Sequence, residues 1–292
     1  MKFILMAIFI VGLFSACQKK DKELVIYANN WIGYTPLLYL QNSGKLKELN
    51  IKVSITNSLE DSLNKYTNDS QNSLFCGTQY EFLQASKSTS DLTTIQVFDK
   101  SDGGDVVLSN KSMYELSHCK EPIDVYLEEN SINSLVFKDF IDLNNLKNHQ
   151  FNLKNSSQDI IKDLELLKKP SLLITYNPYD IKLIQRGYQL LDSTKNLNIC
   201  VVDGLFIDKS LLETNPNRLK KLSKKIKEAI ITLKLDSKKY YQYIKKDIDN
   251  TSYEQFLESL ATIHFINNDM SAQFKERLLS TNIDMEGCDN AK

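Results

Sequence analysis

The stretch Ser101-Asp102-Gly103-Gly104-Asp105-Val106-Val107-Leu108 places two adjacent glycines directly before a short β-branched run. Only nine glycines occur in the chain, so a Gly-Gly pair calls for a local explanation. Glycine permits positive φ and lets another group approach the backbone closely. The stretch predicts a bend followed by a buried strand over Val106–Ser109, which either runs parallel to its neighbours or crosses between two parts of the fold. Taken alone, it also fits a simple turn before a strand.

Length and composition set the scale of the fold around this stretch. The chain has 292 residues, of which 42% are hydrophobic and 25% charged, with a formal net charge of −1. A chain of this size can bury a large core and divides naturally into about two lobes or domains. Nucleic-acid binding calls for a basic excess, which this near-neutral chain lacks, so no nucleic-acid partner is expected.

The N-terminus predicts export. The apolar run Phe3–Phe14 is shorter than the roughly 20 residues that a transmembrane helix needs, and it fits a signal peptide over residues 1–16. Phe14-Ser15-Ala16-Cys17 resembles a bacterial lipobox, in which Cys17 carries lipid and residues 17–23 form a polar tether. We therefore expect an extracytoplasmic protein that is anchored to a bacterial membrane by a lipid on its N-terminus. An ordinary signal peptide with an incidental cysteine is the alternative.

The sequence that follows the tether predicts a βαβ unit. Residues 24–29 form a buried strand, and Thr35 as N-cap with Pro36 at the first helical position starts a helix that ends near Gly44. The alternating run Ile51–Ile55 is the next strand. A βαβ unit implies a parallel sheet whose functional loops lie at the carboxyl ends of the strands.

The remaining pattern continues as α/β. Further strands are expected at residues 73–76, 93–98, 123–126, 171–175, 190–193 and 199–202, and helices at 59–68, 81–85, 131–141, 157–167, 180–187 and from 216 onward. Asn130 and Ser131 would cap one of these helices, and no element is assigned to Leu153. The helix from Asn215-Pro216 carries an apolar stripe of Leu219, Leu222, Ile226, Ile230 and Leu233, which predicts a buried face.

No catalytic or metal-binding motif accompanies these elements. Glycines gather at predicted strand ends, which favours one cleft lined by loops: Gly33, Gly77, Gly103, Gly104 and Gly204. Beyond Cys17, the cysteines Cys76, Cys119, Cys200 and Cys288 show no metal-type spacing, and their disulfide pairing stays open. The histidines are scattered: His118, His149 and His264. The sequence predicts no metal site.

The order of several stretches resembles the extracytoplasmic solute-binding proteins of ABC importers, of the nitrate, sulfonate, taurine and thiamine-pyrimidine type. The matching stretches, within residues 24–245, are Trp31–Leu37, Phe98–Asp105, Thr175–Tyr179, Gly187–Ser193 and Phe206–Pro216. The resemblance implies a two-lobed α/β periplasmic-binding-protein fold of type II, with two inter-lobe crossovers and C-terminal helices. It also implies a small-molecule ligand between the lobes, no cofactor, ABC permease and ATPase subunits as partners, and a monomer.

On this basis residues 24–105 and 203–292 are expected to form lobe I, and residues 106–202 lobe II. The Gly103-Gly104 pair would then lie at the entry to the first crossover, with Ser101 and Asp102 facing the cleft.

The candidate ligand-binding residues lie in the loops that would line this cleft. They are Asn30, Trp31, Gly33, Tyr34, Thr78, Tyr80, Ser101, Asp102, Gly103, Asn130, Ser131, Tyr176, Asn177 and Asp203. Aromatic faces with carboxylates and amides suit a flat heteroaromatic or a cationic solute. The arginines that would hold an anion, Arg186, Arg218 and Arg277, fall outside the predicted cleft loops. A pyrimidine-like or amine ligand is therefore favoured over an inorganic anion, although Trp31 is equally explained as a packing residue.

Two other classes of function stay open. A lipoprotein of the same fold could act as a sensor or surface interaction protein. An enzyme similar to pyrimidine synthases would need clustered His and Cys side chains, and the adjacent pair His118-Cys119 falls in a predicted surface segment.

Overall fold

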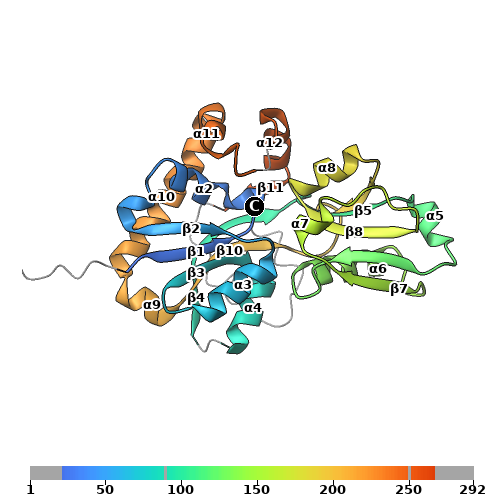
Figure 1. The fold of residues 1–292 in the computed structure, drawn as a ribbon, viewed down its shortest axis with the longest axis horizontal. Coiled ribbons are helices and arrows are strands. Elements are labelled where there is room, and N and C mark those ends of the chain that lie inside the picture. The colour runs from blue at the N-terminus through green and yellow to red at the C-terminus, as the bar shows by residue number, and fades with distance from the viewer. Residues whose placement is uncertain (1–21, 89–90, 249–250, 267–292) are drawn as a thin grey trace, which may run out of the picture.

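A computed structural model describes residues 22–88, 91–248 and 251–266, which form two α/β lobes side by side (Figure 1). In the first lobe these residues build a six-stranded sheet in the order β11-β4-β10-β3-β1-β2. Its strands are β1 (Leu24–Ala28), β2 (Ile51–Ile55), β3 (Ser73–Thr78), β4 (Leu92–Ser101), β10 (Val202–Asp208) and β11 (Ile263–Phe265). The second lobe holds a five-stranded sheet in the order β7-β6-β8-β5-β9. Its strands are β5 (Asp105–Ser109), β6 (Ile123–Leu127), β7 (Phe151–Asn155), β8 (Ser171–Tyr176) and β9 (Gln189–Ser193).

The two sheets share one construction. In each, three parallel strands stand beside an antiparallel strand that arrives from the other lobe. In the first sheet that strand is β10, which is antiparallel to both β3 and β4. In the second sheet it is β5, antiparallel to β8 and β9. Asp105 lies in the second sheet and Val202 in the first, each one residue across the boundary expected from the sequence, and the division of the whole chain into lobes stays a prediction.

The adjacent glycines lie in the first crossing between the lobes. Residues 102–104 join β4 to β5, and residues 194–201 return from β9 to β10. The crossings are hydrogen-bonded to each other, because the Ser101 amide donates to the Val201 carbonyl at 2.9 Å and the Ser101 and Thr194 hydroxyls lie 2.7 Å apart. The Gly103 amide also donates to Thr194 Oγ1 at 2.9 Å, and Gly103 has a φ of +111°. The predicted bend and buried strand are confirmed, and the alternative of a parallel strand is wrong, because β5 is buried throughout and antiparallel to β8.

Helices cover both sheets. In the first lobe they are α2 (Thr35–Asn42), α3 (Leu59–Asn68), α4 (Gln79–Ser88), α9 (Lys209–Thr214), α10 (Pro216–Leu235), α11 (Ser237–Ile244) and α12 (Tyr253–Leu260), with the short 3₁₀ turns η1 (Ile32–Tyr34) and η2 (Lys47–Leu49). In the second lobe they are α5 (Met113–Ser117), α6 (Asn133–Leu143), α7 (Gln158–Ile161) and α8 (Tyr179–Gln185). The apolar stripe predicted for α10 is buried along its length. None of the described helices combines the length and apolar character that a membrane span requires.

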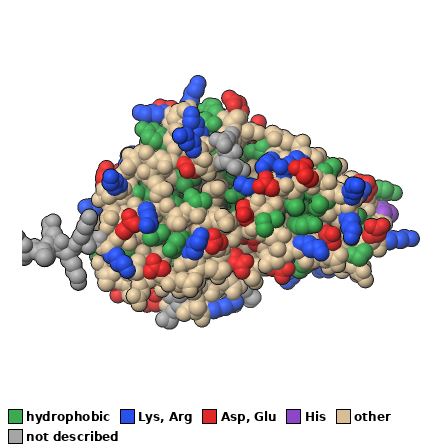
Figure 2. Space-filling model, viewed as in Figure 1, with side chains coloured by type: hydrophobic (Ala, Val, Ile, Leu, Met, Phe, Trp, Pro, Cys, Tyr) green, Lys and Arg blue, Asp and Glu red, His purple; other side chains and the backbone are tan. Residues whose placement is uncertain are grey.

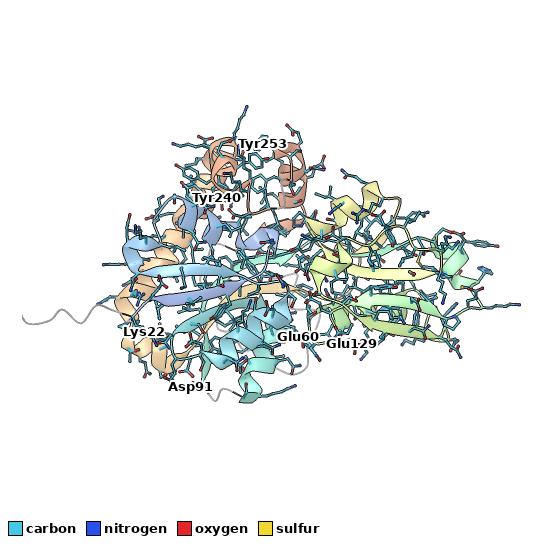
Figure 3. All side chains as sticks on the ribbon, viewed as in Figure 1. Lys22, Glu60, Asp91, Glu129, Tyr240 and Tyr253 are labelled. Atoms are coloured by element: carbon cyan, nitrogen blue, oxygen red, sulfur yellow. The ribbon has the colours of Figure 1, made fainter. Side chains whose placement is uncertain are left out.

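The last helices close over the first lobe. Helices α11 and α12 stand together beyond α2 and β11, with Tyr240 and Tyr253 among them (Figures 1 and 3). Tyr240 stacks on Tyr39 of α2 with ring centroids 4.5 Å apart. Aromatic stacking of this kind contributes beyond the buried area alone. Helices α11 and α12 therefore pack into the core of the first lobe.

Three capping and helix predictions were wrong. Thr35 lies inside α2, and its hydroxyl donates back to the Ile32 carbonyl at 2.9 Å because η1 already begins the turn. Ile132 and not Ser131 is the N-cap position of α6, although the Ser131 hydroxyl accepts from the Asn133 amide at 3.2 Å. The helix expected over residues 157–167 ends as α7 at Ile161.

Strand predictions failed where tertiary pairing decides the structure. Leu153 lies in β7, an edge strand whose residues are mostly exposed and therefore show no apolar alternation. The strand expected at 199–202 is instead the end of the second crossing, and β10 begins at Val202. Gly77 and Gly204 lie inside strands, opposite one another in the β3–β10 register.

We expect Ile226→Ala to lower the free energy of unfolding by about 2–5 kcal/mol, because it would leave a cavity under α10. Ile226 is 0% exposed, whereas Ile231 on the same helix is 46% exposed and serves as the matched control. Ile231→Ala should change stability by less than about 0.5 kcal/mol in the same urea titration. Equal losses for the two variants would contradict the assigned buried face.

Candidate ligand site at the junction of the lobes

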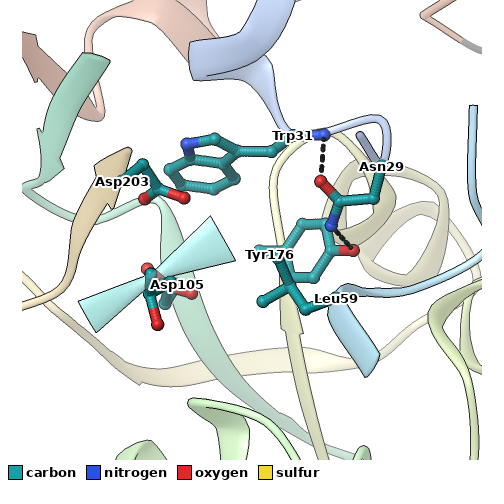
Figure 4. Close-up of a pocket in the computed structure, with 7 residues that line it drawn as sticks. Asn29, Trp31, Leu59, Asp105, Tyr176 and Asp203 are labelled. Atoms are coloured by element: carbon teal, nitrogen blue, oxygen red, sulfur yellow. Dashed lines mark hydrogen bonds between the residues drawn. The ribbon is translucent and has the colours of Figure 1, made fainter. Parts of the chain in front are cut away.

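A small pocket lies where the lobes meet (Figure 4). Its lining comes from both lobes and comprises Asn29, Trp31, Leu59, Thr78, Asp105, Tyr176 and Asp203. Figure 4 shows the two carboxylates on one side, facing Tyr176 and Leu59 on the other. The cavity measures about 10 Å³. A cavity of this size holds about one water molecule, so a larger solute would enter only when the lobes move apart.

Three carboxylates are buried around the pocket. Asp203 accepts a hydrogen bond from the Tyr34 hydroxyl, and Asp99 accepts one from Trp31 Nε1 at 3.2 Å. Asp105 is 3% exposed, and its Oδ2 has no hydrogen-bond partner among the described residues. The charge of these groups is therefore only partly compensated within this part of the chain.

Burial sets the protonation of these acids. Loss of water raises the pKa of Asp105 to about 7, and the neighbouring Glu81 carboxylate adds to that rise. Burial also raises the pKa of Asp99 and of Asp203 well above the usual range, and for Asp203 the nearby Asp99 charge contributes next. Carboxyl groups that share a dry space resist ionising together, so this site favours a ligand that could restore their charge.

Two glycines allow Trp31 and Asp99 to pack this closely. A Cβ on Gly33 would stand 1.8 Å from Asp99 Oδ2, and one on Gly104 would stand 2.5 Å from Trp31 Cη2. The indole therefore lies directly against the first crossing. Its ring also meets Tyr176 edge-on, with centroids 5.7 Å apart and planes at 84°.

Hydrogen bonds join the lobes on both sides of the pocket. Asn29 Nδ2 donates to the Tyr176 hydroxyl at 2.6 Å. The buried Glu81 of α4 accepts from the Thr78 amide at 2.8 Å and from the Ile132 amide of the second lobe at 3.1 Å. With these bonds in place, the lobes are closed on each other.

A further contact lies at the rim of the junction. Asn130 Nδ2 donates to Glu60 Oε1 at 2.9 Å, across the boundary near which Glu60 and Glu129 are labelled in Figure 3. Asn177 of the second lobe accepts from the Ser259 hydroxyl at 3.1 Å and donates to Thr262 Oγ1 at 3.2 Å. Asn130 and Asn177 therefore fasten one lobe to the other.

The structure brings part of the predicted set together. Trp31, Thr78, Tyr176 and Asp203 line the pocket. Tyr34 and Gly33 stand directly behind it, through the Tyr34–Asp203 and Gly33–Asp99 contacts. Asn30 follows Asn29 and carries a buried Oδ1 with no partner among the described residues.

The other predicted residues lie outside the lining. Ser101 and Gly103 belong to the crossing, and Ser131 is buried in the loop before α6. Asp102 turns to the surface, where its carboxylate lies 2.8 Å from His264 Nε2. Tyr80 packs against the apolar core of the second lobe. Contact of these residues with a ligand stays a prediction.

Three lining residues were missed. Asn29 ends the strand that the sequence predicted and could have been found as the neighbour of Asn30. Asp105 lies within the glycine stretch itself but was taken only as the residue before the predicted strand. Leu59 gave no signal, because an apolar residue at the start of a helix is ordinary; it packs with the core of the second lobe.

Cys17 and the signal peptide lie outside the described residues. Of the other cysteines, Cys76 and Cys119 carry free thiols, and Cys200 is disulfide-bonded. No cluster of three or more His, Cys, Asp or Glu side chains suited to a metal ion occurs within residues 22–88, 91–248 and 251–266.

Two sheets joined by two crossings, with a pocket at the junction, define the periplasmic-binding-protein fold, as predicted, with its C-terminal helices on the first lobe. No protein-family model and no curated protein sequence matches the chain.

Solved structures of binding proteins do match it. The aliphatic sulphonate binding protein SsuA from Escherichia coli is 12% identical with a TM-score of 0.65, over 91% of this chain and 97% of that one. The ligand-binding component of an ABC-type import system from Staphylococcus aureus, with zinc bound, is 12% identical with a TM-score of 0.70, over 88% and 90%. The nitrate-binding protein NrtA from Synechocystis is 8% identical with a TM-score of 0.65, over 86% and 73%. At these identities the likeness establishes the fold.

We expect the buried acids to make the protein less stable as the pH rises from about 4 to 7, because they hold protons more tightly when folded than when unfolded. Asp105→Asn should remove one contribution, so its stability relative to the natural protein should rise with pH by up to about 1.4 kcal/mol per unit. Urea titrations across this pH range provide the measurement. Glu129→Gln, at an exposed position, is the control, and a stability difference for Asp105→Asn that does not change with pH would contradict the assignment.

Proposed function

We propose that this protein is the lipid-anchored solute-binding component of an ABC importer, which captures a small organic solute between its lobes and delivers it to a membrane permease. The observation that carries the proposal is the pocket whose lining comes from both lobes. A solute held there would contact both lobes at once, so binding would favour the closed arrangement over an open one.

The crossings supply an axis for this motion. In the described part of the chain only residues 102–104 and 194–201 run between the sheets of the two lobes, and they are held together next to the Ser101–Thr194 contact. Gly103 sits at the bend with positive φ. The bonds across the junction, from Asn29 to Tyr176 and from Glu81 to Ile132, would break on opening and re-form around solute.

A non-catalytic role fits the same geometry. His118 and Cys119 follow α5, which lies at the end of the second lobe far from the pocket (Figure 1). They make separate local contacts, His118 Nδ1 with the Tyr114 carbonyl at 2.9 Å and Cys119 Sγ with the Glu121 carbonyl at 3.4 Å. The similar solved structures named above are binding proteins, which supports the same role here.

The visible surface fits a protein that handles a small solute. Basic and acidic side chains are interspersed over the face shown in Figure 2, with no broad field of one sign. A nucleic-acid surface would gather basic groups on one face. We propose that the protein works as a monomer on the outer side of a bacterial membrane.

The test is recovery of the solute. Protein purified under native conditions should release a stoichiometric small molecule on denaturation, identified by mass spectrometry, and that molecule should bind the emptied protein in a calorimeter. Trp31→Ala should weaken this binding at least tenfold, because the indole is buried in the lining. Tyr114→Ala, at an exposed position on the second lobe, should leave the affinity unchanged. Release of no small molecule would count against a solute-binding role.

A further inference from the structure

The chemistry of the junction pocket indicates which charge its solute carries. We propose that the pocket takes a small organic cation, an amine or amidine whose N–H groups are held by Asp105 and Asp203 while its carbon skeleton lies against Trp31 and Tyr176. This inference rests on the proposed function, since it names the class of solute that the same site would capture.

The lining carries two acidic side chains, Asp105 and Asp203, and no basic one among the described residues that form it, so a bound cation would restore the charge that burial disfavours. Asp105 Oδ2 is buried and has no hydrogen-bond partner in this part of the chain. A buried carboxylate oxygen left in this way costs free energy, which a bound N–H donor would recover.

The donors around the pocket are largely used within the protein. Trp31 Nε1 donates to Asp99 at 3.2 Å, and the Asn29 amide donates to the Tyr176 hydroxyl at 2.6 Å. The Thr78 hydroxyl donates to Glu81 at 2.5 Å. The site therefore offers acceptors to a ligand while most of its side-chain donors are engaged. An anion needs the reverse arrangement, with several donors converging on it.

The arginines that could serve an anion are engaged elsewhere. Arg186 donates to the carbonyls of Lys162 and Leu164 at 2.9 and 3.1 Å, within the second lobe. Arg218 donates to the Leu49 carbonyl at 2.6 Å, at the start of α10 in the first lobe. Both arginines therefore bind backbone carbonyls away from the pocket. Arg277 lies outside the described residues.

The aromatic side chains complete a cation site. Trp31 and Tyr176 stand nearly perpendicular, at 84°, and so present two differently oriented ring surfaces at one pocket. Aromatic faces attract cations, and this attraction strengthens when water is excluded. The cavity measures about 10 Å³ in this closed arrangement, so the cation would enter as the lobes separate.

Calorimetry on the emptied full-length protein tests the class of solute with size-matched probes. The panel holds n-butylamine and acetamidine as cations, n-butanol as the neutral analogue, and propanesulfonate and nitrate as anions. We expect a cation to bind and the other probes not to. Asp105→Asn should weaken that binding at least tenfold, because an amide carries no charge, while the surface variant Glu129→Gln should change it less than twofold.

The outcomes separate this inference from the proposed function. Binding of an anion or of the neutral probe in place of the cations would overturn the cation assignment and leave solute binding intact. Cation binding that Asp105→Asn leaves unchanged would overturn the assigned site, and circular dichroism confirms that the variant is folded. If Asp105→Asn does not fold, or if no probe binds, the charge of the solute released from native protein decides. A cation supports the inference, and an anion or neutral solute overturns it. Absence of any bound solute would refute solute binding and this inference together.

Discussion

The buried carboxylates Asp99, Asp105 and Asp203 are the constraint around which the junction is built. Removing a carboxylate from water is costly unless hydrogen bonds compensate it. The Trp31 indole donates one such bond to Asp99 and the Tyr34 hydroxyl donates another to Asp203. Gly33 and Gly104 leave room for Asp99 and Trp31 to pack together. Residues that looked like separate loop features in the sequence are thus parts of one electrostatic arrangement.

Local sequence signals were enough to predict most of the fold. The strand Ile51–Ile55 and a helix around Leu59–Asn68 were predicted and are observed over those residues, because the sequence patterns that indicate them are local. The Gly103-Gly104 pair was correctly assigned to a crossing. In the structure each glycine has its own reason: Gly103 adopts positive φ, and Gly104 leaves space for the Trp31 ring. The exposed strand β7 and the start of β10 escaped prediction, because neighbouring strands and not their own patterns define them.

The candidate site could be predicted only in part, because its members meet through contacts between distant positions. Tyr34 and Asp203 are 169 residues apart, and Asn29 and Tyr176 are 147 apart. Loop residues with aromatic or polar side chains could be recognised as candidates, so Trp31 and Tyr176 were found. No local pattern could show that Asn130 and Asn177 would join the lobes, or that Asp105 would keep an unpartnered oxygen.

The exchange of strands between the sheets has a consequence for how the chain assembles. All strands of the second sheet lie between residues 105 and 193, so this lobe can complete its hydrogen-bonded ladder from one continuous segment. The first sheet lacks β10, which stands between β3 and β4, until residues 202–208 have emerged. Pairings between distant segments form late because loop closure must precede them. The first lobe therefore completes its sheet after the second lobe does. Until β10 pairs with it, the edge of β3 remains free to pair with an incorrect strand.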